Sequence, residues 1–251
     1  GVARCCLSGA PIQGFRPPSV PLIVQSPLVN VWSNADHLND DTTAQWTGSS
    51  IHMVAMAKVD GEPYLVMGKP GWYSGKKATQ VGLQVWSTQT VYSFQFGGTG
   101  ISMNLTFTTP LLTHDWDLLS RPASYVTFTV AAAEPARGEP AVELYFDVSG
   151  WVVMSDPNTS ATFGSVPLAS DGDATQALYL RAKDQKPLSS ASDTMSWGVA
   201  YLLAENGDSA AVGYAPDMGA AFAASKPPAP SPASPAPLVR ARLLPASGPH
   251  V

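Results

Sequence analysis

The sequence carries little charge of either sign. Only 13% of its 251 residues are charged, and 14 Lys and Arg against 19 Asp and Glu give a formal net charge of -5. Nucleic-acid backbones and anionic lipid surfaces attract proteins through clustered positive charge, which this composition does not supply. We therefore expect neither nucleic acid nor a membrane surface as a partner.

Long hydrophobic runs are also missing. Hydrophobic residues make up 45% of the chain, but Gly, Pro, Ser or a charged residue interrupts each run before it reaches the roughly 20 residues that cross a bilayer. The first residues, from Gly1, lack the basic and then apolar layout of a signal peptide. The sequence therefore predicts no transmembrane segment and shows no signal peptide.

Cysteine is almost absent. Cys5 and Cys6 are adjacent, so they cannot form a disulfide framework, and the redox compartment stays open. Two tripeptides, beginning at Asn104 and Asn158, fit the acceptor pattern for N-glycosylation. The pattern matters only if the protein passes through a secretory pathway, and it also arises by chance.

Helical periodicity is missing as well, whereas a period of two recurs from Arg16 to about Tyr214. One side of the chain carries apolar residues at alternate positions, interrupted by turn sequences such as Asp60-Gly61 and Gly97 to Gly100. Only a strand with one buried face needs this alternation. The pattern predicts a single all-β domain over residues 16–214, an antiparallel β-sandwich whose core contains Phe94, Phe107, Phe128 and Phe146.

The two ends of the chain differ from this pattern. Residues 1–15 show no periodicity and are predicted to form an irregular, disordered leader. Residues 215–251 are rich in Pro, Ala and Ser, most of all from Lys226 to Pro237. Such a composition has little to bury, so we expect an extended, solvated tail.

Motifs that carry chemistry are scarce. The sequence has no Gly-x-Ser-x-Gly, Cys-x-x-Cys or His-Glu-x-x-His motif, and we predict no cofactor and no metal. His52 and His250 are interpreted as polar surface. His114, beside Asp115 and Asp117, is a weak site candidate, with hydrogen-bonded loop packing as the alternative.

The richest polar cluster runs from Trp32 to Trp46. Its side chains could bind calcium through the oxygens of Asn34, Asp36, Asn39, Asp40 and Asp41, although the spacing of an EF-hand is missing. Alternatively, Trp32 and Trp46 flank a polar ligand, which the carboxylates and His37 orient. A third interpretation is an Asx-rich loop that satisfies its own backbone. The substrate-cleft candidates are therefore Trp32, Asn34, Asp36, His37, Asp40, Asp41 and Trp46.

A family resemblance begins at this cluster. The segments 16–22, 31–36, 46–48 and 59–68 resemble, in order and spacing, the opening of the glutaminase A family of fungi and bacteria. The resemblance continues to about Leu203, and its most specific part is the run Leu118-Leu119-Ser120-Arg121-Pro122. The sequence departs from the family pattern at Thr42 and Gln45, where an aromatic residue and a His often stand.

The resemblance implies an N-terminal β-sandwich region followed, in the whole protein, by a helical domain of the (α/α)6 type found in glycoside hydrolases. The whole protein would hydrolyse the side-chain amide of glutamine to give glutamate and ammonia. The chain itself would be inactive, supplying a scaffold and a candidate wall of the active-site cleft. A secreted or extracytoplasmic location is also implied.

Two other functions remain open. Seven Trp and eight Tyr in a sparsely charged β domain also suit a carbohydrate-binding sandwich or an accessory module of a glycoside hydrolase. A row of exposed Trp side chains along one sheet face would favour sugar binding. Burial of most Trp side chains would favour a scaffold.

Overall fold

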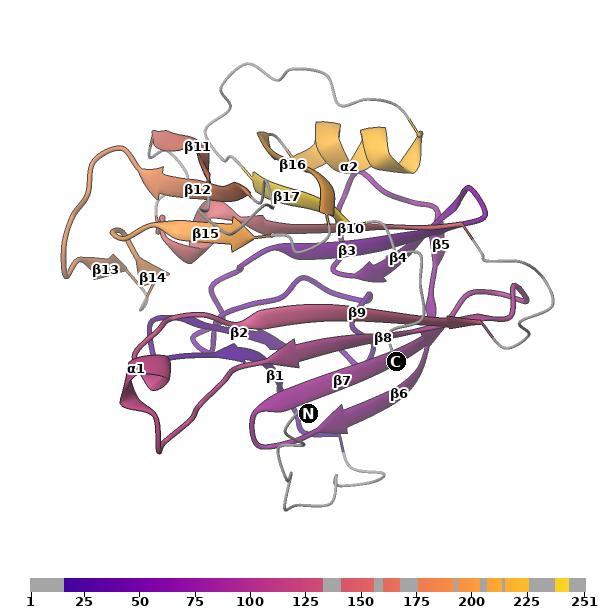
Figure 1. Ribbon diagram of the computed structural model, residues 1–251, viewed down its shortest axis with the longest axis horizontal. Helices are drawn as coiled ribbons and strands as arrows, with labels where there is room; N and C mark the ends of the chain where they lie inside the picture. Colours follow the sequence, from indigo (N-terminus) through magenta and orange to yellow (C-terminus); the bar gives the residue numbers. More distant parts are fainter. Residues whose placement is uncertain are drawn as a thin grey trace.

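The structure is a computed structural model that describes residues 16–132, 141–155, 160–167, 176–191, 194–203, 207–213, 215–225 and 238–243. Two large sheets lie face to face, and a smaller sheet and a helix lie beside and above the upper one (Figure 1). The all-β sandwich predicted from the sequence is confirmed. The leader over residues 1–15 and the sequon at Asn158 lie outside the described residues.

The elements follow one another along the chain as β1 (Val20–Val24), β2 (Asn30–Ser33), β3 (Met53–Val59), β4 (Glu62–Met67), β5 (Lys76–Lys77), β6 (Thr79–Val85), β7 (Gln89–Gln95), β8 (Ile101–Thr108), α1 (Trp116–Leu119), β9 (Tyr125–Ala132), β10 (Val142–Ser149), β11 (Ala161–Pro167), β12 (Gln176–Ala182), β13 (Ser190–Ala191), β14 (Thr194–Met195), β15 (Ala200–Leu203), β16 (Gly207–Gly213), α2 (Ala215–Ala223) and β17 (Leu238–Leu243). No helix in the described part of the chain is long and apolar enough to cross a membrane.

The upper sheet has the strand order β16-β17-β10-β3-β4-β5, and the lower sheet has the order β6-β7-β8-β9. Within the described residues, every strand pairing is antiparallel except that of β4 with β5. A smaller sheet, β11-β12-β15, has its own apolar cluster around Leu178 and Leu180.

The main core fills the space between the two large sheets. It combines alternate residues of β3 and β10, and Tyr64, Val66 and Met67 of β4, with alternate residues of β7 and β8. Of the phenylalanines predicted to point inward, three are almost fully buried and Phe128 is partly buried against the edge of the Phe146 ring. The period of two therefore identified the core face of these strands correctly.

The predicted hairpin turn between β3 and β4 is present. Asp60 has φ 50° and Gly61 has φ 84°, and positive φ at both central residues is what a two-residue turn of type I′ requires. The segment Gly97 to Gly100 likewise joins β7 to β8, with the Thr99 amide donating to the Phe96 carbonyl at 2.9 Å. It is a turn between strands, as predicted.

The predicted tail is where the structure differs most from the sequence prediction. Residues Ala215–Ala223 form helix α2, and Leu238–Leu243 form β17, which pairs with both β10 and β16. Alanine is the best helix former, and Met218 and Phe222, four residues apart, are both buried. The Pro-rich residues 226–237 lie outside the described part of the chain.

Helix α2 covers the outer face of the upper sheet. Phe222 packs with Val54 and Met56 of β3, with Leu65 of β4, and with the Tyr145 ring of β10 at a centroid distance of 5.3 Å. Every residue of β3 is consequently buried. The structure therefore has three layers here, which are helix α2, the upper sheet and the lower sheet.

Candidate functional site

The polar cluster forms the loop between β2 and β3, at the edge of the sandwich where β4 and β5 of one sheet meet β6 of the other. Leu38 and Asn39 fix it there. The Leu38 amide donates to Gln80 Oε1 of β6 at 2.8 Å, and the Leu38 carbonyl accepts from the Gly68 amide at 3.0 Å. Leu38 therefore joins the loop to both sheets at one edge of the sandwich.

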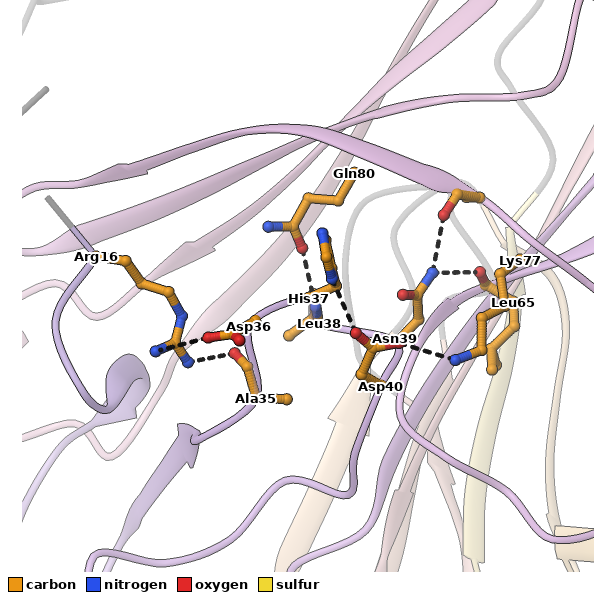
Figure 2. Close-up of polar contacts among 11 residues, drawn as sticks. Arg16, Ala35, Asp36, His37, Leu38, Asn39, Asp40, Leu65, Lys77 and Gln80 are labelled. Carbon is orange, nitrogen blue, oxygen red and sulfur yellow. Dashed lines mark hydrogen bonds and ion pairs between the residues drawn. The ribbon is translucent and has the colours of Figure 1, made fainter. Parts of the chain in front are cut away.

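Asn39 is the interior contact of the loop. It is 3% exposed, and its Nδ2 donates to the carbonyls of Leu65 at 3.1 Å and Ala78 at 2.9 Å (Figure 2). These carbonyls belong to β4 and to the residue that joins β5 to β6. A side chain that the sequence offered as a calcium ligand therefore closes the sandwich edge instead.

The charged side chains of the loop are on its outer surface and have partners within the chain. Asp40 accepts from Lys77 Nζ at 2.9 Å and lies 2.8 Å from His37 Nδ1, while Asp36 lies 3.5 Å from Arg16 Nη1 (Figure 2). The hydrogen bond from Lys77, with a further one from His37, lowers the pKa of Asp40. Lys77 and Arg16 thus neutralise these two carboxylates.

The two tryptophans at the ends of the loop are brought together by Asn30. Its Oδ1 accepts from Trp32 Nε1 and from the Trp46 backbone amide, each at 2.9 Å. Trp46 Nε1 donates to the Pro27 carbonyl at 3.0 Å, and the Trp46 side chain is 59% exposed. Trp46 therefore offers an apolar surface held in a fixed orientation.

The remaining candidates of the loop make local contacts. Asn34 Oδ1 accepts from Ser19 Oγ at 2.7 Å, and Asp41 Oδ1 accepts from the Thr42 amide at 2.9 Å. Gln45, at the position where the family pattern often has His, is buried and accepts from Thr47 Oγ1 at 3.0 Å. These bonds fit the interpretation of an Asx-rich loop that satisfies its own polar groups.

The chemistry available at the loop is limited. The His37 and Asp40 pair has the geometry of an oriented base, but among the described residues no hydroxyl or thiol hydrogen-bonds to the His37 ring. Over the same residues, no group of three or more His, Cys, Asp or Glu is placed to hold a metal ion. The loop can contact a ligand or another domain through Trp46, Asp36 and His37.

The second candidate group, His114, Asp115 and Asp117, lies in the segment between β8 and β9 of the lower sheet. Asp115 is the N-cap of α1, and its Oδ1 accepts from the Leu118 amide at 3.0 Å. His114 and Asp117 are exposed. The signal in the sequence is that Asp is one of the preferred N-cap residues.

A buried polar group was not recognised from the sequence. On the outer face of the upper sheet, Lys58 is 2% exposed, and Tyr145 donates to Asp147 Oδ2 at 2.5 Å. Tyr145 and Asp147 alternate with the core residues Leu144 and Phe146 along β10, so alternation alone does not identify their burial. The helix that covers this face had no counterpart in the sequence prediction.

The tryptophans do not line one sheet face. Trp46, in the loop before β3, and Trp116, in the short helix α1, are 59% and 81% exposed, whereas the other five are partly buried. The feature that would favour a sugar-binding face is therefore not present. Asn104, the described sequon, projects from the outer face of β8 and accepts from Ser93 Oγ at 2.8 Å.

Replacing Asn39 with alanine should lower the free energy of unfolding by about 1 to 2 kcal/mol, because the carbonyls of Leu65 and Ala78 each lose a hydrogen bond from Nδ2. Urea unfolding followed by circular dichroism measures the change. Asn34→Ala is the matched control, since Asn34 is exposed, and a loss below about 0.5 kcal/mol is expected there. Equal losses in both variants would contradict the interior role of Asn39.

Two family models and two curated proteins match this chain. A family model described as "Domain of unknown function (DUF5127)" matches residues 88–234, and one described as "Domain of unknown function (DUF4964)" matches residues 8–71. A probable glutaminase of Arthroderma benhamiae is 26% identical over 82% of this chain and 25% of its own length. Glutaminase A of Aspergillus oryzae is 23% identical over 81% of this chain and 29% of its own length. The chain thus spans about a quarter of the length of these curated relatives.

Proposed function

Because the chain belongs to the DUF5127 family and is similar to glutaminases along most of its length, we propose that it is the N-terminal, non-catalytic portion of a glutaminase A-like protein. In the whole protein it serves as a scaffold and supplies one wall of the active-site cleft. The whole protein hydrolyses the side-chain amide of glutamine.

One observation carries the proposal more than any other: the match covers about four fifths of this chain but only about a quarter of each relative. Most of the residues that a glutaminase of that length contains therefore have no counterpart here. The side chains agree with this, since Asp36 and Asp40 of the Trp32 to Trp46 loop are paired with Arg16 and Lys77. Amide hydrolysis needs a nucleophile or an activated water, a base and an oxyanion stabiliser in one place.

We propose that the partner is a helical domain of the (α/α)6 type, as the family resemblance implies, and that the Trp32 to Trp46 loop faces it. The exposed Trp46 ring provides an apolar contact. Asp36, whose side chain is 87% exposed, and His37 provide polar contacts beside it. This mixture of an aromatic ring and hydrogen-bonding groups is suited to an interdomain cleft.

Ammonia release from glutamine tests the proposal. The purified chain should release no ammonia above the buffer background, while glutaminase A of Aspergillus oryzae, assayed in parallel, serves as the positive control. Turnover that remains through repeated purification, and that is lost in Asp36→Ala or His114→Ala, would overturn the proposal. Such a result would place the catalytic groups within this chain.

A further inference from the structure

Strand β9 has an unpaired edge. It is the last strand of the lower sheet, as Figure 1 shows, and pairs with β8 alone. The β7–β8 ladder is closed at both ends by backbone hydrogen bonds. The Phe96 amide, just after β7, donates to the Ile101 carbonyl at 3.3 Å, and the Thr109 amide, just after β8, donates to the Thr88 carbonyl at 2.9 Å. Because backbone groups alternate in an antiparallel ladder, the even-numbered residues of β8 bond to β9.

The register then identifies the free groups of β9. Ser102 is opposite Ala131, Asn104 opposite Thr129 and Thr106 opposite Thr127. The odd-numbered residues of β9 therefore direct their amide and carbonyl groups to β8. The even-numbered residues direct theirs to the free edge, where no described residue bonds them, and these residues are Val126, Phe128, Val130 and Ala132.

Apolar side chains are also partly exposed along this edge. Val126, Phe128 and Val130 point toward the core but are only partly buried, whereas Tyr92 and Leu105, which occupy the same layer on β7 and β8, are 1% and 0% exposed. The edge thus presents a row of half-buried apolar side chains beside unpaired backbone groups. A strand that paired there would satisfy the backbone and cover the row.

Two other edge strands of the large sheets, β5 and β6, are protected against pairing with another strand. Edge strand β5 is two residues long and consists of Lys76 and Lys77, and β6 has a register shift between Gln80 and Gly82 and is joined to the Leu38 loop. Short length, lysine, bulges and covering loops are the features that block edge pairing in natural sheets. Strand β9 spans eight residues with an unbroken register and contains no charged residue and no proline.

We propose that β9 pairs with β9 of a second copy of this chain, forming a symmetric dimer in which two lower sheets become one continuous sheet. The four strands of the lower sheet contain no Asp, Glu, Lys, Arg or His. An antiparallel edge without charge is complementary to itself, which a two-fold contact requires. Full overlap pairs Val126 with Ala132 and Phe128 with Val130, and places Thr129 opposite Thr129 of the second copy.

This dimer leaves the Leu38 part of the Trp32 to Trp46 loop free, because that part is next to β6, at the opposite edge of the same four-stranded sheet. The Trp46 end bonds to Asn30 and Pro27 of the β1–β2 hairpin. A second copy on β9 and another domain on the β6 side of the loop can therefore bind at the same time. The dimer and the proposed scaffold function can each hold without the other.

Sedimentation equilibrium over the micromolar range tests the dimer. The expected result is a concentration-dependent rise from the 26.3 kDa monomer to twice that mass. Hydrogen exchange should show, with rising concentration, new protection at the amides of Val126, Phe128 and Val130, and unchanged protection at Thr127 and Thr129. A monomer at every concentration, as expected if another segment or domain occupies the edge, would overturn the proposal, and so would open-ended growth.

A charge substitution gives a sharper test. Thr129→Lys places a cation on each copy directly opposite the other, so the dissociation constant should rise about tenfold or more and recover with added salt. Gln95→Lys adds the same charge to the same exposed face two strands away, and it should leave the dimer almost unchanged. Equal effects of the two substitutions would contradict pairing through β9.

Discussion

Replacement of Lys58 with alanine should lower the free energy of unfolding by about 3 to 5 kcal/mol. The Lys58 ammonium group is buried and donates to the Phe222 carbonyl at 2.5 Å and to Ser225 Oγ at 2.7 Å, and it lies 4.7 Å from the centre of the Phe222 ring. Helix α2 has no basic residue in its last turn. Lys58 supplies from the sheet the positive charge that stabilises a helix C-terminus.

Two control variants separate the charge from the rest of the side chain. Lys58→Met keeps the apolar stem and loses the donor, so its loss should be smaller, at about 1 to 3 kcal/mol. Lys69→Ala, at an exposed position, should change stability by less than about 0.5 kcal/mol. Urea unfolding measures all three, and a loss at Lys58 no larger than that at Lys69 would show that the contact contributes nothing.

Gly219→Ala should destabilise the protein by about 2 to 3 kcal/mol, although alanine normally stabilises a helix by about 1 kcal/mol relative to glycine. A Cβ atom at position 219 would lie 2.0 Å from Cη2 and 2.2 Å from Cζ2 of Trp72. Atoms cannot approach so closely, and the Trp72 ring is held between the helix and Tyr73. The steric cost therefore exceeds the gain in helix propensity.

A double-mutant cycle checks this explanation. In the Trp72→Ala background, Gly219→Ala should become neutral or stabilising, because the ring that it meets is gone. Ala220→Gly, at the exposed neighbouring position, should cost about 1 kcal/mol through helix propensity alone. If Gly219→Ala remained as destabilising without the Trp72 ring, close packing of the helix on Trp72 would not be its cause.

The sequence predicted the lower sheet better than the upper one for a physical reason. Strands β7 and β8 have one buried and one more exposed face, so apolar and polar residues alternate, and the core positions of Phe94 and Leu105 could be assigned. Strand β3 is buried on both faces, so the burial of Val54 and Lys58 could not be recognised from alternation. Residues far along the chain, in α2, decide the environment of this second face.

Helix α2 itself was missed because composition outweighed spacing. The Ala and Pro content after residue 214 indicated a solvated segment. Met218 and Phe222, however, are four residues apart, which is the spacing of one helix face. For the candidate site, the sequence showed the polar cluster between Trp32 and Trp46. Its partners Arg16, Lys77 and Gln80 could not be predicted, since only the fold brings them to the loop. The role of the loop in a cleft stays a prediction.

The chain is synthesised from its N-terminus, so strand β3 is made long before helix α2, which covers its outer face. Strand β3 ends at Val59, and the helix that buries its outer face ends at Ala223, so at about 5 to 20 residues per second this face waits roughly ten to thirty seconds for its cover. During that interval Val54, Met56 and Tyr145 form an apolar patch that α2 has not yet covered. A ribosome-bound chain that stops near residue 214 should therefore recruit chaperones, whereas one that extends past residue 225 and has left the exit tunnel should release them.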